Sequence, residues 1–81
     1  MEELKELLIY IATGLVENKE EVKVVVDETT NEEGMIIYKL EVSTPDKGRI
    51  IGKQGRIAKA IRVIMRAAAN RLGKKILVEI I

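Results

Sequence analysis

Two glycines in the middle of the chain, Gly52 and Gly55, bracket the polar residues Lys53 and Gln54. Glycine carries no Cβ and tolerates positive φ, so the turn can be tight and another molecule can approach the backbone closely. If a helix begins near Arg56, its first N–H groups are unpaired and lie at the positive end of the helix dipole. A phosphate is the natural guest of such a helix start. These residues therefore predict a phosphate-binding turn.

Basic and aliphatic side chains surround the glycine pair. Arg49, Arg56 and Lys59 lie within a few residues of it and add positive charge where a phosphate would sit. Some of the neighbouring isoleucines must be core, but aliphatic residues beside a phosphate site also offer a platform for the faces of bases. The candidate binding residues are Arg49, Ile50, Ile51, Gly52, Lys53, Gln54, Gly55, Arg56, Ile57 and Lys59.

The charges of the chain are divided by position. Residues 1–45 carry four lysines against eleven acidic residues, a net charge of −7. Residues 46–75 carry ten lysines and arginines against Asp46 alone, a net charge of +9, and Glu79 brings the total to +1. A solvated face explains most charge runs, but this one surrounds the glycine pair. The second half of the chain is therefore suited to a polyanion.

The residue types needed for most enzyme chemistry are missing. The chain has no histidine and no cysteine, which removes the commonest general base, the commonest metal ligand and all thiol chemistry. The acidic residues cluster in the first half, where none makes a convincing acid–base pair with another. We expect no catalytic residue, no metal site and no cofactor, and hence no enzyme.

Other uses of the glycines fit less well. A nucleotide-binding P-loop needs four residues between its glycines and a hydroxyl after its lysine. Gly48 and Gly52 enclose three residues, and Gln54 follows Lys53. A turn that only joins two helices does not need two glycines with a lysine between them. RRM and OB domains rely on stacking aromatics, and this chain has two tyrosines and no other aromatic residue.

The first half of the chain predicts a helix and a hairpin. A helix is expected over about 2–17, because its apolar residues have the spacing of one buried stripe. Alternating valines predict a strand over 22–27, and a second alternating run predicts a strand over 35–42. The polar segment 29–34 has turn composition, so the strands should form an antiparallel hairpin. The stripe of the helix is Leu4, Leu7, Leu8, Ile11 and Leu15.

The second half predicts two helices and a last strand. Ser43 and Thr44 precede Pro45, a capping pattern that predicts a short helix over about 45–51. A long helix is expected over about 56–72, with Gly73 as the residue that ends it, and a strand over 75–81. The order α-β-β-α-α-β predicts an α+β fold with a three-stranded sheet and three helices on one face. The buried stripe of the long helix is Ile57, Ile61, Ile64, Met65, Ala68 and Leu72.

The glycine pair and its flanks carry a family resemblance. The segment 51–57 resembles the GXXG signature of KH domains, with an aliphatic residue before the first glycine and Ile57 after the loop. The element order is similar to the type II KH arrangement. The whole chain, residues 1–81, resembles the small bacterial single-KH proteins of the KhpA family. The resemblance implies one KH domain that binds single-stranded RNA, because a GXXG loop clamps the backbone of four nucleotides.

The resemblance also implies partners. It implies a homodimer, or a heterodimer with a larger protein of the KhpB, Jag or EloR type, and a role as RNA chaperone or adaptor. The alternative is a protein-dimerisation module linked to control of cell elongation, with RNA binding secondary. Ile9 and Val16 lie off the predicted stripe of the first helix and are candidates for that contact. We expect a cytoplasmic protein, because the acidic N-terminal segment does not resemble a signal peptide and no apolar run is long enough to span a bilayer.

Overall fold

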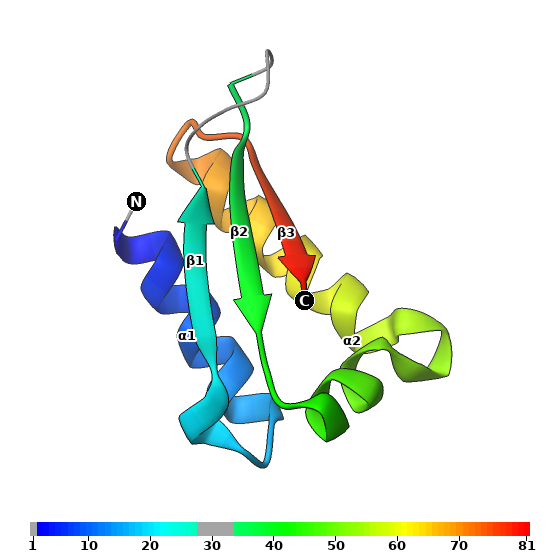
Figure 1. The fold of residues 1–81 in the computed structure, drawn as a ribbon. Helices are drawn as coiled ribbons and strands as arrows, with labels where there is room; N and C mark the ends of the chain where they lie inside the picture. The colour runs from blue at the N-terminus through cyan, green and yellow to red at the C-terminus, as the bar shows by residue number, and fades with distance from the viewer. Residues whose placement is uncertain (1, 28–33) are drawn as a thin grey trace.

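The computed structural model describes residues 2–27 and 34–81, and their side chains apart from those of Glu2 and Lys53. The predicted turn at 29–34 lies outside the described residues except for Gly34. The order of elements confirms the predicted α+β fold, and Figure 1 shows the helices behind one face of the sheet. The elements are α1 (Glu2–Leu15), the 3-10 helix η1 (Lys19–Glu21), β1 (Lys23–Asp27), β2 (Ile36–Glu41), α2 (Thr44–Arg71) and β3 (Ile76–Ile80).

The sheet is mixed, with β2 in the centre. β1 pairs antiparallel with β2, so that Val24 lies opposite Leu40, and the predicted hairpin is confirmed. β3 pairs parallel with the other side of β2, where Val78 lies opposite Tyr38. A parallel pair needs a long crossover connection, and α2 provides it. β1 and β3 are therefore the edges of the sheet.

α2 contains both of the helices expected in the second half of the chain. Ser43 caps its start, since the Ser43 hydroxyl accepts a hydrogen bond from the Asp46 amide at 3.3 Å. The backbone breaks at Gln54 and Gly55, which have φ of 64° and 69°. Figure 1 shows the helix turning back on itself there, in a loop that projects from the molecule. We call residues 44–51 the first arm, residues 52–55 the glycine turn and residues 56–71 the second arm.

The core lies between the sheet and the helices. Tyr38 and Leu40 of β2 are fully buried in this core, and so is Met65 of the second arm. The second arm ends as predicted, because Gly73 follows it with φ of 70°. None of the described helices is long and apolar enough to cross a bilayer.

The predicted stripe of α1 is correct at Leu4 and Leu8 and wrong at Leu15. Leu15 is 41% exposed, and burial continues instead through Ala12 and Val16. The buried row thus repeats every four residues. The prediction relied on large apolar residues and therefore missed the small side chain of Ala12. Val16 is 6% exposed and belongs to the core, so the prediction that it contacts a partner is wrong.

The second arm is also rotated from its predicted phase. Ile61 is buried as expected, but Ile64 and Leu72 are 47% and 45% exposed. The reason is again alanine, since two small residues are part of the buried row and the larger Ile64 and Leu72 are turned outward. The buried row of the second arm consists of Ala58, Ile61, Met65 and Ala69.

Candidate nucleic-acid interface

The glycine turn combines two left-handed residues in succession. Gly55 adopts φ of 69° without penalty, because it has no Cβ. Gln54 adopts φ of 64°, a conformation that costs an L-residue roughly 1–2 kcal/mol. Backbone strain of this kind persists where the surrounding structure fixes it, and it clusters at binding sites.

Gly52 has a different property from Gly55. Its φ is not positive, and a Cβ built on it would meet no other heavy atom within 4 Å. Neither its own conformation nor the packing around it therefore requires glycine. Glycine weakens a helix by about 1 kcal/mol relative to alanine, so folding alone would favour alanine at this position. The open space beside Gly52 is therefore available to a molecule from outside.

The basic residues of the second arm divide between two sides. Arg62 and Arg66 border a small depression against β3, and the Arg62 Nε donates a hydrogen bond to the Val78 carbonyl at 3.3 Å. Lys59 lies one helical turn before Arg62 on the same face. Arg56 lies on the other side, facing α1. We call Lys59, Arg62 and Arg66 the basic row.

The basic row extends the predicted site beyond the residues proposed from sequence. Lys59 was among the candidates, whereas Arg62 and Arg66 were not. The available signal was spacing, because Arg62 follows Lys59 by three residues and Arg66 follows Arg62 by four. What the sequence could not provide was their position beside the edge strand β3, because that depends on how the second arm packs.

The isoleucines around the turn have different environments. Ile51 is 45% exposed at the end of the first arm, and Ile57 is half-buried at the start of the second. Ile50 is 1% exposed and lies in the core, so its predicted contact with RNA is wrong. Neighbouring residues on a helix point about 100° apart, and the first arm turns Ile50 inward and Ile51 outward. The side chain of Lys53 lies outside what the structure describes.

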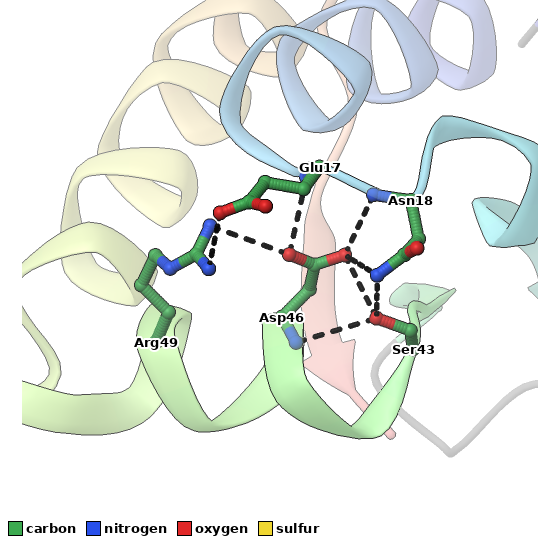
Figure 2. A network of polar contacts seen from close by, with 5 residues as sticks. All are labelled: Glu17, Asn18, Ser43, Asp46 and Arg49. Atoms are coloured by element: carbon green, nitrogen blue, oxygen red, sulfur yellow. Dashed lines mark hydrogen bonds and ion pairs between the residues drawn. The ribbon is translucent and has the colours of Figure 1, made fainter.

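A buried carboxylate joins the first arm to the segment that directly follows α1. Asp46 is 1% exposed and accepts hydrogen bonds from the backbone amides of Glu17 and Asn18 at 3.1 and 3.0 Å. The Ser43 hydroxyl donates to it at 2.8 Å, and the Asn18 side-chain amide donates at 3.2 Å. Figure 2 shows these donors converging on the two carboxylate oxygens. The first arm, which carries the glycine turn, is thereby fixed against α1.

These donors decide the protonation of Asp46. Burial of the carboxyl raises its pKa, but the hydrogen bonds from Glu17, Ser43 and Asn18 favour the charged form more strongly. The net result lowers the pKa of Asp46 to about 2. The carboxylate is therefore fully charged at neutral pH. The sequence showed Asp46 as the one acidic residue of a basic segment, but that alone did not indicate this role.

Arg49 is paired with acidic residues. Its Nη2 lies 2.7 Å from the Glu17 Oε1, and its Nη1 lies 3.4 Å from the Asp46 Oδ1. Figure 2 shows the side chain directed toward the end of α1. The predicted cation is thus close to the glycine turn along the chain, but its charge is engaged by two carboxylates.

An apolar groove of about 630 Å³ lies between α1 and the second arm. Tyr10 and Ile64 on its walls are 77% and 47% exposed. Arg56 and Lys19 add positive charge to its lining. Ile9, a predicted partner contact, is half-buried and packs against the core. The groove is lined by, among others, Tyr10, Gly14, Leu15, Ile57, Ala60 and Ile64.

The described residues hold no cluster of acidic side chains that could bind a metal ion. Lys39 pairs with Asp27 on the sheet at 3.8 Å, far from the glycine turn along the chain. In the described part of the chain, Arg56, Lys59 and Arg66 form no ion pair. Their charges are therefore available to an anion.

Known proteins resemble this chain over nearly its whole length. A family model described as "KhpA/KhpB, KH domain" matches residues 5–80. The "RNA-binding protein KhpA" of Clostridium perfringens is 53% identical over 78 residues, which cover 96% of this chain and 100% of that protein. The proteins of the same name from Listeria monocytogenes and Aquifex aeolicus are 46% and 38% identical, and the matches cover 99% of each. These relatives carry the name of a binding protein and not of an enzyme.

Two solved structures share the fold. Crystal structures of Aquifex aeolicus Era and of Era in complex with MgGDPNP and a segment of 16S ribosomal RNA both match with a TM-score of 0.63 at 23% identity. The matches cover 96% and 95% of this chain, which spans only 29% and 28% of the Era chains. At this level of identity the likeness concerns the fold alone.

Proposed function

Because the chain belongs to the KhpA/KhpB family of KH-domain proteins, we propose that it binds short single-stranded RNA through the glycine turn. The relatives named as RNA-binding proteins support this function. One observation carries the assignment to the turn. The space beside Gly52 is open and serves no internal contact, and it lies next to the strained backbone of Gln54.

The sugar-phosphate backbone would lie on the glycine turn, at the N-terminal end of the second arm. The positive end of the helix dipole favours phosphate there, and the missing Cβ of Gly52 lets the backbones approach closely. Lys53 belongs to the same turn in the sequence and adds a positive charge to it in this proposal. From the turn, the RNA would follow Lys59 along the basic row beside β3, with bases against the exposed Ile51.

This arrangement favours modest sequence preference and strong salt dependence. One turn contacts about four nucleotides, and the aliphatic neighbours provide few hydrogen bonds that distinguish bases. The logarithm of the binding constant should fall with the logarithm of salt concentration by about 0.7 per neutralised phosphate. We place the activity in the cytoplasm, as an RNA adaptor or chaperone, within a single domain of residues 1–81.

The test replaces both polar residues of the turn. Lys53→Asp with Gln54→Asp should abolish RNA binding in a filter or anisotropy assay, because two carboxylates would repel the phosphates. The matched control, Lys5→Asp with Asn70→Asp, makes the same change in net charge near the start of α1 and near the end of α2, away from the glycine turn along the chain. The control should retain most of the affinity. Equal binding by the turn variant and the wild type would refute the assignment.

A second function is supported by the apolar groove. We propose that it accommodates another protein chain, either a second copy or a larger KhpB-type partner. Exposed aromatic and aliphatic side chains in one concave patch are typical of interaction sites, and Tyr10 and Ile64 provide them. This function is compatible with RNA binding. We include in the proposal a link between this protein contact and the control of cell elongation.

Light scattering on neighbouring variants tests this surface. Ile64→Glu places a charge in the groove and should give a monomer. Val63→Glu makes the same charge change at a residue that is 61% exposed and does not line the groove. It should leave the mass unchanged. A wild-type protein that is monomeric alone and with the larger partner would exclude the groove as an interface.

A further inference from the structure

Arg49 is a cation whose charge is already balanced. It lies one helical turn before the glycine turn, and its guanidinium is shared between Glu17 at 2.7 Å and Asp46 at 3.4 Å. One positive charge thus faces two negative charges, so these three side chains together carry a net charge of −1. In this arrangement the guanidinium is occupied by carboxylates, although the sequence places an arginine there for a phosphate.

The two carboxylates differ in freedom. Asp46 is 1% exposed and is held by amides of Glu17 and Asn18 and by the Ser43 hydroxyl. The Glu17 side chain is 74% exposed, and its contact with Arg49 spans 32 residues of sequence. Of the two, Glu17 is therefore the partner that can leave without exposing a buried charge.

We propose that Glu17 limits the affinity of the protein for RNA by holding Arg49, and that a bound phosphate displaces the Glu17 carboxylate from the guanidinium. This inference rests on the proposed RNA-binding function. The exchange replaces one charge-assisted hydrogen bond of Arg49 with another of the same kind. Asp46 keeps its contact with the Arg49 Nη1 and holds the guanidinium in place during the exchange.

The size of the effect follows from the exposure of the pair. Exposed ion pairs are weak and are screened by salt. Releasing Arg49 from Glu17 is therefore expected to tighten RNA binding by about two- to fivefold at low salt. The gain should disappear at about 1 M salt, where the Debye length falls to ~3 Å.

Glu17→Gln tests the proposal, because glutamine has nearly the same shape and leaves the backbone amide that binds Asp46. Glu6→Gln is the matched control. It makes the same charge change on an exposed residue near the other end of α1. Binding of a fluorescent single-stranded oligouridine should tighten in Glu17→Gln and change much less in Glu6→Gln. Equal affinities of the two variants, or weaker binding by Glu17→Gln, would overturn the proposal.

An Arg49→Gln background separates release of the arginine from simple repulsion. If Glu17 acts by holding Arg49, the gain from Glu17→Gln should fall by at least half once the guanidinium is gone. A gain of the same size in both backgrounds would show that Glu17 repels RNA directly, and it would overturn the proposal.

The result for Glu17→Gln can be distinguished from the result that tests the proposed RNA-binding function. If the wild type binds RNA and the double turn variant does not, the function stands, and the Glu17 result concerns this inference alone. If the wild type binds no RNA, or the turn variant binds equally well, the proposed function fails first.

Discussion

Replacing Gly52 with alanine should stabilise the protein and weaken its binding to RNA. The φ of Gly52 is not positive, as in a helix, and an added Cβ meets no other heavy atom within 4 Å. Alanine lowers the entropy of the unfolded chain and favours helix, which together contribute about 0.5–1 kcal/mol. For a domain of this size the melting temperature should rise by roughly 2–8 °C.

The same Cβ occupies the space where we place the RNA backbone. A hydrogen bond to a charged group contributes about 1.5–3 kcal/mol, so the loss of one amide–phosphate contact should weaken binding by roughly 10- to 100-fold. Thermal unfolding by circular dichroism measures the first effect, and fluorescence anisotropy with a short single-stranded RNA measures the second. The two effects have opposite signs, which no purely structural role of Gly52 produces.

Two neighbouring glycines provide the controls. Gly48 lies in the first arm, one turn before Gly52, and a Cβ there would also meet no other heavy atom within 4 Å, so Gly48→Ala should stabilise similarly and change RNA binding little. Gly55→Ala should destabilise by about 1–2 kcal/mol, because its φ of 69° is costly for any residue with a Cβ. Destabilisation by Gly52→Ala would refute the argument that its conformation leaves room. If Gly52→Ala stabilised the protein but left its RNA affinity unchanged, the proposal that RNA occupies the space beside Gly52 would be refuted.

Three further predictions concern other parts of the molecule. Asp46 has a pKa of about 2 in the folded protein against an ordinary value of 3.8, so its contribution to stability is complete above about pH 5 and is lost as pH falls through 3.8 toward 2. Asp46→Asn should therefore be less stable at pH 7 and show a flatter decline in acid, as measured by urea unfolding at several pH values. Arg66→Gln should reduce the salt slope of RNA binding by about 0.7 if the RNA follows the basic row, and an unchanged slope would place the RNA elsewhere. Met65→Ala removes a fully buried side chain and should cost about 2–5 kcal/mol, and a loss below about 1 kcal/mol would contradict the described core.

The sequence was a good guide to the elements and to the turn. The order of helices and strands, the hairpin and the helix end at Gly73 were all predicted, because each depends on local patterns. The glycine pair was also identified from spacing, and the structure shows left-handed φ at Gln54 and Gly55. Whether these residues contact RNA stays a prediction.

The sequence was a poor guide to the phase of the helices. The prediction weighed large apolar side chains, and it therefore turned Leu15 and Ile64 inward. The buried rows instead include the small residues Ala12 and Ala58, while Leu15 and Ile64 are exposed. In the first arm, Ile50 is buried in the core although it stands beside the exposed Ile51 in the sequence.

By itself the sequence determined a basic second half, a glycine turn between two helices and a family, since these depend on residue types and their spacing. Only the tertiary structure decided which charges are available. Asp46 receives hydrogen bonds from amides 28 and 29 residues away, and Arg49 pairs with Glu17 across 32 residues. Contacts over such separations form only when α1 packs against the first arm. A count of charges along the chain therefore cannot show which cations are already paired.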